Sequence, residues 1–514
     1  MTIVEELLKL QDSELAIKSQ SLFSDCEGTQ RRVLNEILHE AEDTEYGRKY
    51  GFSDIQSVAG YREAVPLSEW NDYADCSERM KRGESDITFS GKAMSFTISA
   101  GTTSPKLKYI PVSAMQTQAF KLVERLRQIR YFIAEPQLQQ GVLMPLVNRP
   151  ESETTQAGIP AGNASGMSIQ RSNIKDKLAF PLSVFQITDD NERDYQMMLS
   201  AISHRDVYVI AGNNAGRMTG LARMAQERRD DIIRDMERID PERADELRAM
   251  KEFIPAEYWK DLKLGLFWMS ASVGKYVDEL RQLLPPSTKF MDVGYGSSEA
   301  KFNIPLRPEE TSGVLSTATA FYEFIPEEGG SPLLAHQVEA GKNYELVITT
   351  WGGLYRYNMK DIVRVTGFVG NTPMIEFQYK SIEVLNMVDE KLPVNLVCDI
   401  IRQYLAEKGC QVRQIQIYQD VQKHCYQCYV EPVQGHIESG EATDQAVDDL
   451  LTRQLYAYDL FRNKSHVLER LHITEMRQGW QQSLYQKAVR KPGITNSQVK
   501  LSLIAKEDEG AWSI

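Results

Sequence analysis

The hydrophobic pattern of this chain changes twice along its length, and these changes constrain the fold more than any other feature. Up to about residue 293, short apolar runs such as 207–211 alternate with segments of helical period such as 113–132. This alternation predicts an α/β arrangement with a buried sheet. Residues 313–377 then alternate with period two and contain no sustained helical period, which predicts a mostly antiparallel β subdomain.

From about residue 380, helical and strand patterns mix again over a stretch that is long enough for a separate domain. We therefore expect an α/β fold with two domains. The large N-terminal domain spans 1–380 and includes the β-rich subdomain, and a small α+β domain spans 381–514.

Charge and composition exclude several classes of protein. The chain of 514 residues has a net charge of −13, whereas general nucleic-acid binding requires a basic surface. No apolar run approaches the roughly 18 residues that a membrane span needs, and the N-terminus lacks the pattern of a signal peptide. We therefore expect a cytoplasmic protein without nucleic-acid or membrane partners, with a monomer as the default state.

Six cysteines in a chain of this length do not make a disulfide framework, so we expect no disulfide-linked partner. Cys425 and Cys428 have the spacing of a metal or redox motif. However, the sequence around them predicts a strand, in which positions i and i+3 point to opposite faces. We therefore favour two ordinary core cysteines.

The stretch Ser99–Lys108, with the sequence SAGTTSPKLK, is the one best suited to hold a phosphate. It follows an expected strand and precedes an expected helix at 113–132. Backbone N–H groups can surround an anion only where side chains are small, and hydroxyl side chains add donors. Taken alone, the stretch is also compatible with an ordinary polar turn. Ser99, Thr102, Thr103 and Ser104 would supply the hydroxyl donors, and Lys106 or Lys108 would add positive charge.

The sequence GYGSSE at 294–299 places four functional side chains after an expected strand. Tyr295 can stack on an aromatic base. Ser297 or Ser298 can hold a phosphate oxygen. Glu299 can bind Mg²⁺, which prefers oxygen ligands.

A third segment, WGGLYRYNMKDIVRV at 351–365, places Asp361 just ahead of a β run. A carboxylate in that position can accept hydrogen bonds from both hydroxyl groups of a ribose. Each of the three segments has a structural explanation when taken singly. Their combination and order are more specific, and they predict a nucleotide site.

Together, the three segments resemble the nucleotide-binding motifs of the Gretchen Hagen (auxin-responsive) family of acyl-acid amido synthetases. This family belongs to the superfamily of adenylate-forming enzymes. The resemblance runs nearly end to end, and further segments that carry it include TEYGRKYGF at 44–52, SASVGKYVDEL at 270–280 and NSQVKL at 496–501. It implies a large N-terminal domain that binds ATP and the acyl substrate, a small mobile C-terminal domain, and ATP and Mg²⁺ as cofactors.

Position by position, the resemblance implies that Ser99, Gly101, Thr102 and Thr103 of the first loop hold the phosphates of ATP. Tyr295 would lie by the adenine and Ser298 near the phosphate. Glu299 would hold Mg²⁺, and Asp361 would bind the ribose. Lys500, in the sequence SQVK, would stabilise the charge that develops during adenylation, so Lys500 and Glu299 are the expected catalytic residues.

The sequence departs from the family pattern at three places. Ala100 stands where a second serine is common, and Ser104-Pro105 stands where a glycine is usual. Lys360 also replaces a usual glycine. If that position requires a positive φ, a lysine there costs on the order of 1 kcal/mol. Alternatively, its ammonium group adds charge near the phosphates.

The resemblance implies an ATP-dependent ligase that adenylates a carboxylic acid and transfers the acyl group to an amine, most often of an amino acid. An acyl-CoA ligase using the same acyl-adenylate is an alternative. Because of the three departures, a catalytically impaired homologue that binds a nucleotide or an acid is another. The candidates for binding the acid are Arg125, Arg130 and Tyr322.

Overall fold

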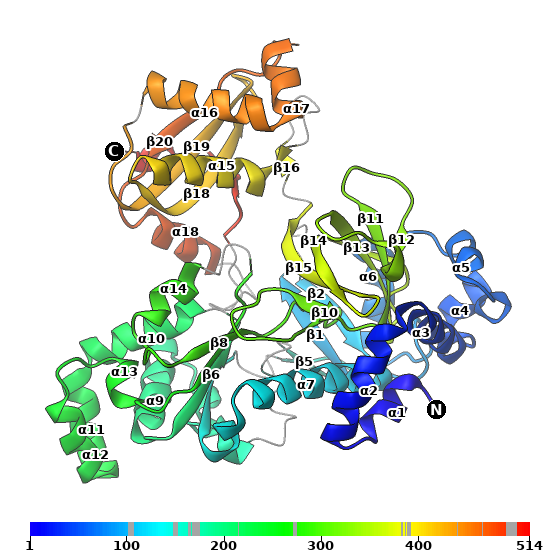
Figure 1. Cartoon of the computed structure of the whole chain (residues 1–514), viewed down its shortest axis with the longest axis horizontal. Coiled ribbons are helices and arrows are strands. Elements are labelled where there is room, and N and C mark those ends of the chain that lie inside the picture. The colour runs from blue at the N-terminus through cyan, green and yellow to red at the C-terminus, as the bar shows by residue number, and fades with distance from the viewer. Residues whose placement is uncertain are drawn as a thin grey trace. The chain divides into compact units, whose positions relative to one another are not determined.

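The computed structural model in Figure 1 describes residues 1–100, 107–147, 153–162, 166, 175–213, 215–270, 275–381, 384–385, 387, 392–438, 440–464, 466–489 and 501–513. Contacts divide the chain into two compact units, Met1–Gln378 and Tyr379–Ile514. Each unit is described by itself. The roles expected for the two domains, and the mobility of the second, stay predictions.

Helices form the first part of the larger unit. They are α1 (Ile3–Leu8), α2 (Asp12–Ser24), α3 (Cys26–Ala41), α4 (Glu45–Tyr50), α5 (Val58–Ala64) and α6 (Trp70–Lys81). In α3, apolar side chains at helical spacing, including Val33, Ile37 and Ala41, are buried in the core. This core also contains side chains of the antiparallel sheet described below.

The predicted phosphate loop is flanked by two paired strands, not by a strand and a helix. β1 (Ser95–Ala100) pairs antiparallel with β2 (Leu107–Val112), and Ser99 is opposite Lys108. Helix α7 (Ala114–Ala134) begins only after β2. The expectation of a strand–loop–helix unit was therefore wrong, because the short run Leu107–Val112 forms a strand of its own. β5 (Pro160–Gly162) and β4 (Glu153–Thr154) complete this sheet in the order β2-β1-β5-β4.

A parallel sheet of order β3-β6-β7-β8 forms the α/β part of the unit. Its strands are β3 (Val142–Leu146), β6 (Val207–Gly212), β7 (Leu264–Phe267) and β8 (Lys289–Asp292). One apolar cluster contains Phe267 and Phe290 together with side chains of the helices between the strands, and a second contains Leu264 and Leu266 with Tyr131 of α7. The helices that connect the strands are α9 (Asp190–Ser203), α10 (Ala215–Glu227), α11 (Arg229–Ile239), α12 (Pro241–Ala249), α13 (Pro255–Tyr258) and α14 (Lys275–Arg281).

The predicted β subdomain is confirmed as a sheet of order β12-β11-β13-β14-β15-β10-β9. β10 pairs antiparallel with β9 and β15, β11 pairs antiparallel with β12 and β13, and β13 pairs antiparallel with β14. Its strands are β9 (Asn303–Pro305), β10 (Gly313–Leu315), β11 (Ala320–Pro326), β12 (Leu333–Leu334), β13 (Asn343–Thr350), β14 (Tyr357–Val369) and β15 (Thr372–Lys380).

The smaller unit has its own sheet and core. The sheet order is β20-β19-β18-β21. Cys425 and Cys428 lie in β19, and both are buried free thiols, as the strand pattern predicted. The main elements of this unit are β16 (Val384–Leu385), β17 (Leu392–Pro393), α15 (Val394–Glu407), β18 (Gln411–Asp420), β19 (Cys425–Gln434), α16 (Glu441–Gln454), α17 (Tyr456–Asp459), β20 (His472–Glu475), α18 (Trp480–Val489) and β21 (Ile504–Ala505).

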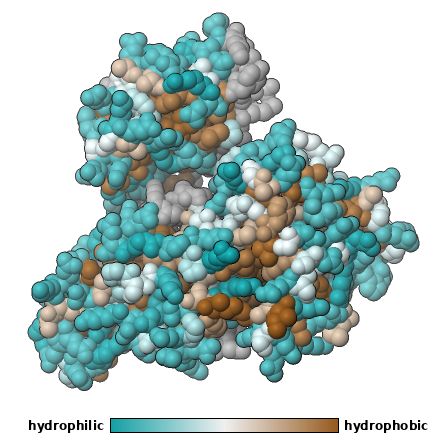
Figure 2. Space-filling model, in the orientation of Figure 1, coloured by the Kyte–Doolittle hydropathy of each residue, from teal (hydrophilic) through white to brown (hydrophobic). Residues whose placement is uncertain are grey.

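Figure 2 shows a mainly hydrophilic surface on the face in view, with hydrophobic residues in separate patches. Exposed large apolar side chains come from different elements, for example Ile17, Ile133 and Val421. None of the helices in the described residues is long and apolar enough to cross a membrane.

Candidate functional site

The carboxyl end of β8 carries the second predicted motif. β8 ends at Asp292, and the chain then passes through Gly294, which has a φ of +84°, to Tyr295. In an open parallel sheet, ligands bind at the edge formed by the carboxyl ends of the strands. The motif therefore lies where an α/β fold ordinarily places a ligand.

Tyr295 and Asp361, predicted from separate motifs, are in direct contact. The Tyr295 hydroxyl donates to Oδ2 of Asp361 over 2.5 Å, and the two residues are 4% and 3% exposed. Burial, followed by the Asp361 carboxylate, raises the pKa of the Tyr295 hydroxyl, which therefore stays a donor near neutral pH. The Tyr295 ring stacks on Phe302 with a centroid distance of 4.3 Å. The tertiary structure thus joins the second and third motifs in one buried pair.

Ser297, Ser298 and Glu299 differ in what they contact. Oγ of Ser297 accepts hydrogen bonds from the backbone N–H groups of Glu299 and Ala300, at 3.1 and 3.4 Å, so its hydroxyl forms the turn. Within the described residues, the side chains of Ser298 and Glu299 make no hydrogen bond or ion pair, and both are half-buried. These two side chains fit a role toward a ligand better than Ser297 does.

The donor set suits Mg²⁺ bound partly by phosphate, but not an all-protein metal site. In the described parts of the chain, no group of three or more His, Cys, Asp or Glu side chains could hold a metal ion. Mg²⁺ in phosphoryl-transfer sites is commonly held by one or two carboxylates together with substrate phosphates. The carboxylate of Glu299 is a suitable ligand of that kind.

Buried polar atoms next to the two motifs also fit a polar ligand. Nε2 of Gln116 lies 3.5 Å from the backbone oxygen of Glu299, whereas Oε1 of Gln116 is buried and has no hydrogen-bond partner among the described residues. The same holds for Nε1 of Trp351, in the third motif. A buried polar group without a partner costs about 1–3 kcal/mol, which a bound ligand or an ordered water offsets.

Arg127 holds the second motif in place, a role that was not predicted. Its guanidinium donates to the backbone oxygen of Asn303 over 2.6 and 3.0 Å and to that of Tyr295 over 3.1 Å. The side chain is buried, and burial lowers its pKa. Helical spacing carried a signal for this role, because Arg127 follows the buried residues Ala119 and Val123 at intervals of four on α7.

Asp292 fixes the start of the same loop. Oδ1 of Asp292 accepts a hydrogen bond from the N–H of Gly294 over 2.6 Å, and Oδ2 accepts one from the N–H of Met269 over 2.7 Å. Burial raises the pKa of this carboxyl to about 6. Asp292 therefore links the ends of two neighbouring strands, β7 and β8.

The third motif is anchored by buried contacts. The Tyr355 backbone oxygen accepts from Ser68 Oγ over 2.8 Å and from the Tyr73 hydroxyl over 3.1 Å. Nε of Arg356 donates to Oε2 of Glu323 over 2.9 Å, and both side chains are buried. These contacts fix the backbone that leads into Asp361.

Lys360 adopts the positive φ that a glycine at this position would allow, with a value of +53°. Its Nζ lies 3.2 Å from Oε1 of Glu69 and 3.8 Å from Oε1 of Glu345. The alternative in which its ammonium group serves the phosphates is therefore not supported, because the group is beside two carboxylates of the protein.

The three candidates for acid binding have different surroundings. Arg125 donates to Oδ1 of Asp12 over 2.7 Å and to the backbone oxygens of Leu8 and Leu10, so it fastens α7 to the N-terminal helices, and its role toward the acid stays a prediction. Tyr322 is fully buried in the core, and its hydroxyl donates to the Ser316 backbone oxygen over 3.4 Å. Arg130 is half-buried, and it makes no hydrogen bond or ion pair with any described residue.

Several predicted residues lie outside the described part of the chain. These are Gly101, Thr102, Thr103, Ser104, Lys106 and Lys500. Ser99 is placed only through its backbone, in β1.

Models of one protein family match most of the chain. The model described as the GH3 family N-terminal domain matches residues 18–289, more than half of the sequence. The chain belongs to the GH3 family. A second model, the GH3 family central domain, matches residues 313–380 of this GH3-family chain. The family that the sequence resembles is thereby confirmed.

Curated relatives of this GH3-family chain cover most of its length. It is 24% identical to a protein of Nicotiana attenuata named jasmonoyl–L-amino acid synthetase, over 87% of this chain and 85% of that protein. It is 23% identical to the indole-3-acetic acid-amido synthetase GH3.6 of Arabidopsis thaliana, over 75% of this chain and 73% of that protein.

Solved structures share the fold of this GH3-family chain. A structure titled GH3.15 acyl acid amido synthetase matches with a TM-score of 0.82 at 18% identity, covering 98% of this chain and 95% of that one. A 2-hydroxyisobutyryl-CoA ligase in complex with 2-HIB-AMP matches with a TM-score of 0.53 at 12% identity, over 94% and 90% of the two chains. The predicted α/β, adenylate-forming fold class is confirmed.

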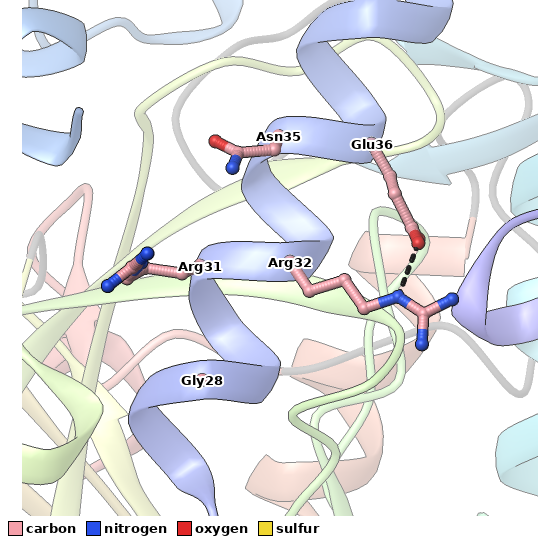
Figure 3. A pocket seen from close by; sticks show the side chains of 5 residues that line it. All are labelled: Gly28, Arg31, Arg32, Asn35 and Glu36. Carbon is pink, nitrogen blue, oxygen red and sulfur yellow. Dashed lines mark hydrogen bonds and ion pairs between the residues drawn. The ribbon is translucent and has the colours of Figure 1, made fainter. Parts of the chain in front are cut away.

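The cavity in Figure 3 lies away from these motifs in the sequence. It has a volume of about 410 Å³, and the residues that line it, all in α3, are Gly28, Arg31, Arg32, Asn35 and Glu36. Arg31 and Asn35 point to one side of the helix, whereas Arg32 and Glu36 point to the other, where Nε of Arg32 donates to Oε1 of Glu36 over 2.7 Å. This cavity contains none of the predicted site residues, and we assign it no role in the family's chemistry.

Proposed function

We propose that this GH3-family chain is an ATP-dependent acyl-acid amido synthetase. It would join a carboxylic acid to AMP with release of pyrophosphate, and then transfer the acyl group to an amine, in the first instance that of an amino acid. The observation that carries the proposal is the buried pair of Tyr295 and Asp361 beside Ser298 and Glu299, in a chain of the GH3 family. The names of the relatives supply the reaction class.

The first half-reaction overcomes the poor reactivity of a carboxylate. An acid oxygen attacks the α-phosphorus of ATP, the bond from that phosphorus to the bridging oxygen breaks, and pyrophosphate leaves. The acyl carbon then has AMP as its leaving group. When Mg²⁺ is bound, it neutralises phosphate charge. In this chain, Asp361 would accept the ribose hydroxyls, and Tyr295 would keep the Asp361 carboxylate oriented.

Three further groups complete the proposed nucleotide site. Ser298 would donate to a phosphate oxygen, and Glu299 would ligate Mg²⁺. The Ser99–Thr103 loop would surround the phosphates with backbone N–H groups, since its side chains are small. Lys500 would stabilise the charge that builds up as pyrophosphate leaves, because a cation placed at a developing charge lowers the barrier.

Arg130 is the candidate that we retain for the carboxylate of the acid. Burial lowers the pKa of its guanidinium, and no described residue forms an ion pair with it. A half-buried arginine that no described residue pairs with gains a charge-assisted hydrogen bond when a carboxylate binds.

The decisive experiment is acid-dependent exchange of labelled pyrophosphate into ATP, measured with a panel of aryl, indole and aliphatic acids. We expect exchange with at least one class of acid and none without acid. A folded protein that gives no exchange with any acid would exclude adenylation and favour the impaired homologue. Products formed with amino acids or with coenzyme A then separate amide synthesis from thioester synthesis.

A further inference from the structure

Strand β14 contains an irregularity directly before Asp361. In the pairing of β13 with β14, Glu345 is opposite Ile362, but Val347 is opposite Asn358. Residues 359–361 of β14 therefore lie opposite Leu346 alone, which is a β-bulge. Bulges change the direction of a side chain and are common next to active sites.

The bulge requires an unfavourable backbone conformation. Lys360, at its centre, has a φ of +53°. A non-glycine residue in this left-handed region costs on the order of 1 kcal/mol, so the surrounding structure must compensate for the cost. A glycine at this position would adopt the same conformation without strain.

The side-chain amide of Asn358 supplies this compensation through both its oxygen and its nitrogen. Its Oδ1 accepts a hydrogen bond from the N–H of Lys360 over 2.9 Å, which closes a local turn around the bulge. Its Nδ2 donates to Oε1 of Glu345 on the neighbouring strand over 2.7 Å. Asn358 is buried, so these bonds are shielded from competing water.

The same carboxylate also approaches the lysine side chain. Oε1 of Glu345 lies 3.8 Å from Nζ of Lys360. Asn358, Glu345 and Lys360 thus form a connected polar group around the bulge. The bulge ends at Asp361, whose Oδ2 is 2.5 Å from the Tyr295 hydroxyl.

We propose that Asn358 is a positioning residue for Asp361: it holds the left-handed bulge at Lys360 and so aims the Asp361 carboxylate at the ribose of the bound nucleotide. This inference rests on the proposed function. It assigns Asn358 no contact with substrate, only control over where Asp361 lies. In a chain with glycine at 360, the same hydrogen bond would have little strain to offset.

The test compares the binding of ATP and 2′,3′-dideoxyATP, which lacks both ribose hydroxyls, by calorimetry without added acid, so that no turnover is needed. We expect N358A to weaken ATP binding about tenfold and 2′,3′-dideoxyATP binding less than twofold, so the ratio of the two affinities decreases. N343A is the matched control, because Asn343 in β13 also donates to a carboxylate, Glu327, but is opposite Arg364 and away from the bulge. N343A should leave both affinities unchanged.

A double-mutant cycle tests whether backbone strain at Lys360 causes the effect of N358A on ATP binding. In a K360G background, where the bulge is unstrained, N358A should change ATP binding less than threefold. An equal loss for both nucleotides, or an undiminished loss in the K360G background, would overturn the proposal. If N358A does not fold, N358L, which has a similar shape but no hydrogen-bonding groups, is measured in its place with the same expectations.

The outcomes also separate this inference from the proposed function. If the wild-type chain binds neither nucleotide, the proposed function fails and the inference fails with it. If the wild-type chain binds ATP with a preference over 2′,3′-dideoxyATP that N358A leaves intact, only the positioning role of Asn358 is lost.

Discussion

At the residue scale, the Asp292 carboxyl group is the strongest source of pH dependence near the site. It is buried, and burial raises its pKa from about 3.8 to about 6. A carboxyl group whose pKa is raised by folding binds a proton more tightly in the folded state. Its contribution to the free energy of unfolding is therefore largest below pH 4 and falls as the pH rises toward 6. Above about pH 6 the contribution stays constant, and the total decrease is about 3 kcal/mol.

We therefore predict that D292N removes this pH dependence. Between pH 4.5 and 7.5, the free energy of unfolding of D292N should rise relative to that of the wild type by about 2 kcal/mol. The comparison between variant and wild type cancels the titration of all other groups. Urea unfolding at a series of pH values measures it, and a difference that is independent of pH, or that moves the other way, would contradict the assignment.

At the element scale, the turn after β8 depends on how closely it approaches α7. A Cβ atom added at Gly294 would lie 2.4 Å from Nη2 of Arg127, and Gly294 has a positive φ. By contrast, the nearest atom to a Cβ at Gly296 would be the Ala300 backbone oxygen, 3.5 Å away, and Gly296 is not among the residues of positive φ. Gly294 thus has no space for a Cβ atom and needs a positive φ, whereas neither restriction applies to Gly296.

We predict that the G294A and G296A variants differ clearly in stability and in ATP binding. G294A combines backbone strain with displacement of a buried arginine, so it should cost about 3 kcal/mol or more of stability and weaken ATP binding. G296A should change stability by less than about 1 kcal/mol. Thermal unfolding and ATP calorimetry measure both effects, and similar behaviour of the two variants would show that the contact between Arg127 and this turn is not important.

At the scale of the whole molecule, the nucleotide motifs and the predicted catalytic lysine fall in different compact units. Tyr295 and Asp361 belong to Met1–Gln378, whereas Lys500 belongs to Tyr379–Ile514. Movement of one domain can separate two half-reactions by changing which residues face the site. A lysine that acts only in the first half-reaction would then be dispensable in the second.

We predict that K500A lowers acid-dependent pyrophosphate exchange about 100-fold, the usual cost of losing one group that stabilises a transition state. Transfer from a prepared acyl-adenylate to the amine should keep its rate. K506A is the matched control, since Lys506 is an exposed lysine in the same unit. Full exchange activity in K500A would show that the lysine was wrongly assigned.

Local patterns account for much of what was predicted correctly. The period-two alternation over 313–377 identified the antiparallel sheet, because side chains on successive strand residues face opposite sides. Small and hydroxyl residues at the ends of strands indicated the motifs. The family resemblance, in which glycine is usual at position 360, raised the positive φ that Lys360 adopts. Each of these signals lies within a few residues of the feature that it predicts.

The sequence by itself therefore determined the fold class and the family, and it predicts which residues form a nucleotide site. Only the tertiary structure decided which residues meet. Tyr295 contacts Asp361 across 66 positions, and Arg127 reaches Asn303 across 176. The tertiary structure also showed that Arg125 binds the N-terminal helices and that residues 107–112 form a paired strand. The physical reason is that local propensity depends on near neighbours, whereas burial and hydrogen-bond partners depend on segments brought together only by packing.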